Sequence, residues 1–206
     1  MSDGSFQRRG SIQITMTNKT YLDYLHDVLG WMSNQVCMHT TALGQANKSQ
    51  SLEALSDDPS NYKDVYVMRS KTHDWLRDVY DTWQTENGKI IPKNVELTPT
   101  IVRHWYCGDG CLDFGGRGEP SARIKAEFMQ DHLNRIREMF GDIGFKHHIT
   151  DNGAIIISQT DTREFLQWMS PGHPVPGFEY KWTTSIEEQK KLRSAYESTQ
   201  TISTHE

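Results

Sequence analysis

The stretch LTPTIVRHWYCGDG occupies residues 97–110 and combines a helix-start signal with an acidic end. Proline suits the first turn of a helix, because the amide hydrogen that it lacks would have no partner there, so we expect a helix to begin near Thr98 and Pro99. The helix is expected to run to about Cys107 and to end at Gly108-Asp109-Gly110, since glycine favours helix ends. The chain therefore presents an aspartate at the end of a helix, directly before a glycine.

The Asp109-Gly110 pair has a counterpart at Asp3-Gly4, 106 residues earlier (109 − 3). After each pair the sequence predicts the same order of elements: a strand, a helix, further strands and another helix. We therefore expect each half to be a mixed α/β unit, and the two halves to form a pseudo-twofold pair of sheets. A long strand face of this kind can lie in the major groove of DNA and reach the base edges.

Periodicity and turn signals predict the individual elements. Residues 7–17 alternate between apolar and hydrogen-bonding side chains, which is typical of a half-exposed strand. Helices are expected at residues 19–32, 73–83, 128–140, 163–169 and 185–196. Strands are expected at residues 36–43, 65–70, 121–127, 145–149 and 154–159, and loops at residues 44–62 and 171–182.

The composition bounds the class of protein. The chain has 206 residues, of which 35% are apolar, and a net charge of −5, which suits one domain or two small fused ones. No run approaches the roughly 20 apolar residues of a membrane helix, and no N-terminal segment indicates export. Three cysteines without a disulfide framework favour a reducing, intracellular compartment, either cytoplasm or organelle matrix. We interpret Cys37, Cys107 and Cys111 as ordinary buried thiols rather than zinc ligands.

Several segments resemble the LAGLIDADG homing endonuclease family, in its monomeric type with two motifs. Residues 97–110 resemble the second motif, in which a helix ends in an acidic residue followed by glycine. Ser2-Asp3-Gly4-Ser5 resembles the end of the first motif, whose helix is truncated in this sequence. Further resemblances lie at NKTYL (18–22), GKIIPKN (88–94), FL (165–166) and PGFEYKW (176–182), so that the matches extend from residue 2 to residue 182.

The resemblance implies an α+β fold of two pseudo-symmetric αββαββα repeats that form a saddle of antiparallel sheets. The expected divisions are residues 1–94 for the first repeat, 95–182 for the second, and 183–206 for a C-terminal helix or tail. It also implies a site-specific double-stranded DNA endonuclease, encoded in an intron or intein or free-standing. Such an enzyme acts as a monomer on a long recognition site and leaves short 3′ overhangs.

Carried over position by position, the resemblance makes Asp3 and Asp109 the metal-binding carboxylates. Lys89 and Lys181 become the two basic residues that flank the active sites. Mg²⁺ suits this arrangement because it binds few carboxylates and keeps several waters, so one aspartate from each half and phosphate oxygens suffice. Taken without the resemblance, Asp109-Gly110 is a plain helix end and the two lysines are solvated surface residues.

Polar residues on the strand faces are the candidates for contact with DNA. Arginine and lysine suit guanine edges and glutamine suits adenine, whereas the alternative is ordinary solvent exposure. The candidate DNA-binding residues are Gln7, Arg9, Gln13, Thr15, Arg117, Arg123 and Lys125.

Two other functions stay open. One is a nucleic-acid-binding protein of the same fold that does not cleave, such as a maturase that binds intron RNA, and the truncated first motif favours it. The other is a structural protein without a nucleic-acid partner, which rests only on the acidic net charge.

Overall fold

The computed structural model describes residues 4–50, 62–86, 88–115, 119–126, 131–171 and 174–202, and gives only the backbone at 47–50, 88–89 and 197–202. The chain divides into two compact units. The first unit is formed by the chain up to Tyr80 together with the segment from Arg193, and the second is formed mainly by Asp81–Leu192.

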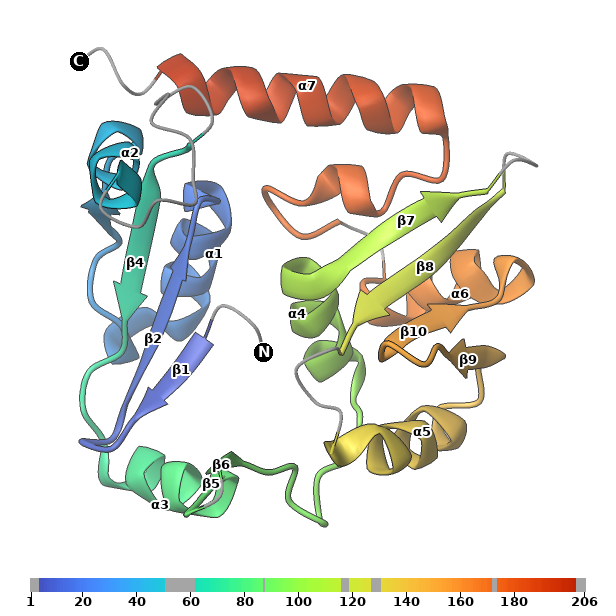
Figure 1. The fold of residues 1–206 in the computed structure, drawn as a ribbon, viewed down its shortest axis with the longest axis horizontal. Helices are drawn as coiled ribbons and strands as arrows, with labels where there is room; N and C mark the ends of the chain where they lie inside the picture. The colour runs from blue at the N-terminus through green and yellow to red at the C-terminus, as the bar shows by residue number, and fades with distance from the viewer. Residues whose placement is uncertain are drawn as a thin grey trace. The chain divides into compact units, whose positions relative to one another are not determined.

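The first unit contains a four-stranded antiparallel sheet in the order β1-β2-β4-β3 (Figure 1). Strands β1 and β2 form a hairpin whose turn contains Gly10, with a φ of 85° that suits glycine. The bounds of its strands are β1 Gly4–Gln7, β2 Ser11–Met16, β3 Cys37–Thr40 and β4 Val65–Arg69. Its helices are α1 Lys19–Leu29, η1 Gly30–Met32, α2 Ala42–Gln50 and α3 Asp74–Trp83.

Helix α1 contacts β2 and β4 and supplies the apolar side of this unit. The Asn18 side chain caps the helix by accepting a hydrogen bond from the Tyr21 amide at 3.0 Å. Leu22 is fully buried, as is Met68, which lies opposite Ile14 in the strand register. One face of the sheet is therefore apolar, and the polar residues of the alternating strands lie on the other.

The second unit repeats this sheet with the order β7-β8-β10-β9 (Figure 1). Its strands are β7 Gly110–Phe114, β8 Pro120–Lys125, β9 His147–Ile149 and β10 Ala154–Ile157. Its helices are α4 Pro99–Asp109, α5 Leu133–Asp142, α6 Gln159–Met169 and η4 Glu179–Lys181, and α7 (Ile186–Ile202) follows. A short hairpin, β5 (Gln84–Thr85) and β6 (Gly88–Lys89), precedes α4. The repeated strand order confirms the α+β class with two similar repeats.

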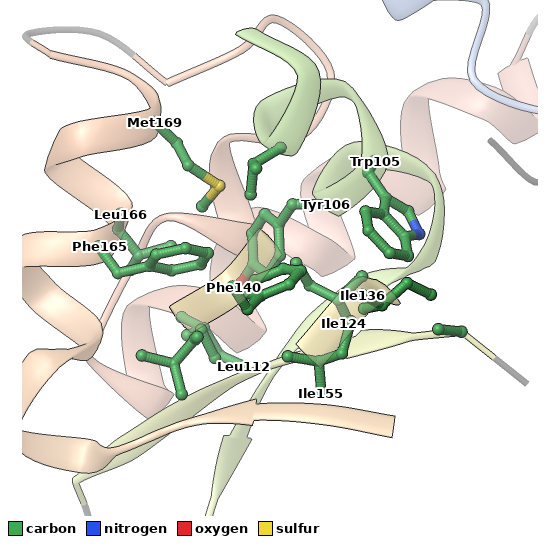
Figure 2. Close-up of a cluster of buried hydrophobic side chains, with 14 residues drawn as sticks. Trp105, Tyr106, Leu112, Ile124, Ile136, Phe140, Ile155, Phe165, Leu166 and Met169 are labelled. Atoms are coloured by element: carbon green, nitrogen blue, oxygen red, sulfur yellow. The ribbon is translucent and has the colours of Figure 1, made fainter. Parts of the chain in front are cut away.

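The core of the second unit is rich in aromatic side chains (Figure 2). Tyr106, Phe140 and Phe165 are fully buried, and the Trp105 and Phe140 rings lie 6.0 Å apart in an edge-on arrangement. Val102, Trp105 and Tyr106 point from α4 into this core, so one side of the helix is fixed against the sheet. Burial of these side chains holds the end of α4, and with it Asp109, in one place.

Some expected elements differ from the structure. The single strand expected at 7–17 is a hairpin, because Gly10 reverses the chain between β1 and β2. Helix α2 takes up residues 44–50 of the expected loop and the last two residues of the strand expected at 36–43, which ends at Thr40. The first amide of α2, that of Ala42, is capped by the Asp64 carboxylate at 2.8 Å. The sequence did not predict β7, which begins directly after α4. Its buried and exposed residues alternate, but the strand is short and contains no run of apolar side chains. Helix α5 begins at Leu133, later than expected, although residues 127–130 lie outside the described part.

Candidate active site and polar sheet faces

Asp109 is the last residue of α4. Thr98 caps the start of the helix by accepting from the Ile101 amide at 3.3 Å, and Pro99 occupies the first turn, as expected. The Gly110 amide closes the helix by donating to the Tyr106 carbonyl, and β7 begins at Gly110. The Asp109 carboxylate is partly exposed, at the end of the helix where the carbonyl dipoles give a negative potential. A cation is favoured there.

Gly110 lets the strand leave the helix at close range. A Cβ atom at Gly110 would lie 2.1 Å from Cδ2 of Tyr106 and 2.5 Å from its carbonyl oxygen. The φ of Gly110 is −92°, so the need for glycine comes from this approach and not from a left-handed backbone. The glycine of the Asp-Gly pair is thus required by the packing of Tyr106, and it sets where the preceding aspartate lies.

Hydrogen bonds between Lys181 and the last turns of α4, including Tyr106, fix the end of this helix. Lys181 is buried, with 7% of its surface exposed, and its Nζ donates to the carbonyl oxygens of Cys107 at 2.6 Å and Tyr106 at 3.4 Å. In return, the Tyr106 hydroxyl donates to the Lys181 carbonyl at 2.9 Å. Burial raises the pKa of the Tyr106 hydroxyl, so this group remains a donor. The Lys181 Nζ also lies 4.7 Å from the centroid of the Phe178 ring.

The second unit has a polar face on the side of its sheet away from the core. Across the strands, Cys111 lies opposite Arg123, Arg123 opposite Ile156, and Ile156 opposite His148. Ala122 and Ile124, the neighbours of Arg123 in β8, are fully buried on the core side. Arg123 and Lys125 therefore lie on the polar face, as the alternation predicted.

The register also relates Lys125 to Asp109. Gly110 pairs with Ile124 at the first step of the β7–β8 ladder, and Asp109 and Lys125 are the next residues outward on the two segments. Both are at least partly exposed. Lys125 is thus placed at the same end of the ladder as the Asp109 carboxylate.

The polar face of the first unit contains a row across three strands. Ser5 lies opposite Gln13, and Gln13 opposite Arg69. The side chains of Gln7 and Ser5 are hydrogen-bonded at 2.9 Å. Gln7, Gln13 and Thr15 are half-buried strand residues, whereas Arg9 is an exposed residue of the β1–β2 turn. Arg69 was not selected from the sequence. The available signal was a basic residue at the end of a predicted strand, in a unit whose other strand alternates between apolar and polar side chains.

Several candidate residues are not placed by the structure. Asp3 and Arg117 lie outside the described residues, and Lys89 is described only by its backbone, in β6 opposite Gln84. The structure therefore brings together Asp109 and Lys181 at the end of α4, with Lys125 at the adjoining end of β8. The role of Tyr106 was also missed, because it depends on a contact between residues 75 positions apart.

The cysteines differ from their expected burial. Cys107 is buried, but Cys37 and Cys111 are exposed because their side chains project from sheet strands on the side away from the core. Within the described ranges no three His, Cys, Asp or Glu residues gather to hold a metal ion. A metal at Asp109 would therefore depend on further oxygen ligands from elsewhere, as suits Mg²⁺.

His104, on the last turns of α4, makes stability depend on pH. Burial, with a smaller effect of Arg103, lowers the pKa of His104 to about 4. Between about pH 6.5 and 4 the unfolded chain binds the proton and the folded chain does not, so stability falls as the pH decreases. We expect the free energy of unfolding to drop by about 2 kcal/mol between about pH 7 and 5 from this group alone.

Urea unfolding of wild type and His104→Gln at these two pH values checks this expectation. The glutamine variant should lose that part of the pH dependence, and His39→Gln, which replaces an exposed histidine, should keep it. Equal pH dependence of wild type and His104→Gln would contradict it.

Two sheet units, each with one polar face, and an aspartate at the junction of helix and strand define an α+β protein of the two-repeat type. Comparison with known families agrees: the model of the LAGLIDADG DNA endonuclease family matches residues 1–165. This chain therefore belongs to the LAGLIDADG DNA endonuclease family.

Solved structures show the same fold. The structure of the homing endonuclease I-WcaI bound to its DNA recognition sequence matches with a TM-score of 0.59 and 16% sequence identity. The match covers 89% of this chain and 82% of that one. None of the curated protein sequences matches this chain. Among the described residues, no helix is both long and apolar enough to cross a membrane.

Proposed function

We propose that this protein is a site-specific endonuclease that hydrolyses both strands of a long DNA site with a divalent metal ion, Mg²⁺. The observation that carries the proposal is the position of Asp109, which is partly exposed at the end of a helix whose other side is buried. Strand β7 begins at Gly110, directly after Asp109, and belongs to a sheet with a polar face. DNA bound on that face would therefore lie close to the Asp109 carboxylate. The I-WcaI structure holds DNA and has the same fold.

The residues at this end of α4 fit a hard metal ion. Asp109 supplies a carboxylate oxygen, and we propose that Asp3 supplies the equivalent one from the first repeat. Mg²⁺ is bound in many phosphate-processing sites by one or two carboxylates with waters and substrate oxygens. When bound, such an ion activates water and stabilises charge on the phosphate oxygens. The helix-end potential at Asp109 favours a cation in the same place.

The three lysines are proposed to have different tasks. Lys125 is exposed at the end of the ladder beside Asp109, so its ammonium group can approach a phosphate and stabilise negative charge in the transition state. Lys89 is proposed to do the same in the other half. Lys181 donates to the carbonyls of α4, and these contacts support a positioning role, in which it holds the turn that carries Asp109.

The polar sheet faces are proposed to bind the DNA. Gln7, Gln13 and Thr15 in the first unit and Arg123 and Lys125 in the second lie on such faces. Arg9 and Arg117 belong to the same proposal as phosphate contacts. Because the net charge is −5, binding would depend on these local cations and weaken as salt increases. The repeat boundaries, the monomeric state and any intron RNA partner stay predictions.

Cleavage selection tests the proposal over many possible target sequences at once. The protein is incubated with a randomised duplex library and Mg²⁺, adaptors are ligated to newly formed ends, and the ends are sequenced. We expect the ends to share one long motif and to disappear when EDTA replaces Mg²⁺. Binding to the same library in EDTA is selected in parallel. A motif that is enriched by binding, without new ends in Mg²⁺, would favour the non-cleaving alternative. If neither binding nor cleavage enriches a motif, the proposal is contradicted.

A further inference from the structure

Arg69 and Gln13 form a fixed pair on the polar face of the first unit. They lie directly opposite each other on β4 and β2, and Arg69 Nε donates to Gln13 Oε1 at 2.9 Å. The amide of Gln13 continues the chain of hydrogen bonds, since its Nε2 donates to Thr15 Oγ1 at 3.3 Å. Three side chains on two strands are therefore linked in one direction, from Arg69 to Thr15.

This chain of hydrogen bonds uses part of the hydrogen-bonding capacity that Gln13 would need to read a base. Recognition of adenine by glutamine uses the amide oxygen and the amide nitrogen together, to N6 and N7 of the base. In Gln13 the oxygen already accepts from Arg69 and the nitrogen already donates to Thr15. Each of these two atoms keeps one further hydrogen-bonding position, but the two bonds fix the direction of the amide between Arg69 and Thr15, so Gln13 is better suited to hold Arg69 in place.

Arg69, by contrast, is oriented so that it can donate hydrogen bonds to a base. Its Nε is engaged, which fixes the plane of the guanidinium group, while its two terminal nitrogens make no hydrogen bond to a residue within the described part of the chain. Arg69 is half-buried at the end of β4, on the face opposite the fully buried Met68. The two terminal N–H groups can donate in parallel, which matches O6 and N7 of guanine.

The second unit offers a comparison at the corresponding row. Arg123 has Cys111 and Ile156 as its neighbours across the strands, and neither can accept a hydrogen bond as an amide oxygen does. The Arg123 Nε has no hydrogen-bond partner among the described residues. Its guanidinium group is not held in the manner of Arg69.

We propose that Arg69, oriented by Gln13, reads a guanine in the DNA site, and that Gln13 supports this arginine instead of reading a base itself. The inference rests on the proposed function, because it requires the polar face of the first unit to lie on DNA. The pair of Arg69 and Gln13 thereby selects guanine at one position of the target.

Binding selection followed by sequencing tests the pair. Wild type, Arg69→Ala, Arg69→Lys and Gln13→Ala are each used to select from a randomised duplex library in EDTA, so that cleavage does not remove the bound sequences. We expect the wild-type motif to contain a guanine whose replacement weakens binding by about 5- to 150-fold, the range of one bidentate contact. Arg69→Ala should lose the preference at that position alone.

The other variants separate the two roles. Gln13→Ala should reduce the same guanine preference, and Arg69→Lys should not restore it, because a lysine cannot present two parallel donors. The remaining positions of the motif report that each variant is folded, and Arg123→Ala should leave this guanine preference intact.

Three results would overturn the inference. Uniform weakening of all sequences by Arg69→Ala, with the motif unchanged, would show a phosphate contact. Loss of an adenine preference on Gln13→Ala would show that Gln13 reads a base directly. If wild type selects no motif at all, the proposed function fails together with the inference, whereas the first two results leave the proposed function standing.

Discussion

The Asp109→Asn variant is expected to lose double-strand cleavage by at least about 1,000-fold while it still binds the selected DNA site. Asparagine keeps the size of the side chain but removes the charge that would hold a metal ion at the end of α4. Binding should be kept or become slightly tighter, because the change removes a negative charge near the phosphates. The rate of formation of linear product from a supercoiled plasmid that carries the site measures cleavage, and an electrophoretic shift measures binding.

A matched variant separates loss of the carboxylate from general damage. Asp142 is the last residue of α5, as Asp109 is of α4, and it is exposed. Asp142→Asn should therefore cleave at the wild-type rate. Linear product formed at the wild-type rate by Asp109→Asn would remove Asp109 from the active site and leave the catalytic assignment without support.

The Lys181→Met variant is expected to lower the free energy of unfolding by about 2–4 kcal/mol. Methionine fills the space but leaves the buried carbonyls of Cys107 and Tyr106 without the donor that Lys181 supplies, and removes the cation from the Phe178 ring. Urea unfolding measures the loss of stability. Hydrogen exchange measures its location, and we expect faster exchange at the Gly110 amide, which closes the last turn of α4.

An exposed lysine provides the control for this prediction. Lys190 lies on α7, and Lys190→Met should change the stability by less than about 0.5 kcal/mol. If Lys181→Met keeps wild-type stability and exchange but loses cleavage, Lys181 acts on the substrate, as the family resemblance implied. A loss of stability with faster exchange in α4 supports the positioning role instead.

Much of the architecture is decided by local sequence. Thr98 and Pro99 mark the start of α4 because they act within one turn, and the Asn18 cap marks the start of α1 in the same way. Alternation in β2 and β8 assigned Gln13, Thr15, Arg123 and Lys125 to the polar faces. These signals depend only on neighbours in the sequence. Capping preferences therefore locate the helix starts, and the two-residue period locates the strand faces.

The sequence by itself thus determined the repeated α+β units, the helix that ends in Asp109, and the sides of the strands that carry polar groups. Only the tertiary structure decided that Lys181 is buried on the carbonyls of α4, that Gly110 must be glycine because of Tyr106, and that Arg69 meets Gln13. The partners in these contacts, apart from Gly110 and Tyr106, come from distant segments, and Arg69 and Gln13 are 56 residues apart. Their pairing depends on strand order and register, which arise when the whole unit packs and leave no periodic signal in the chain.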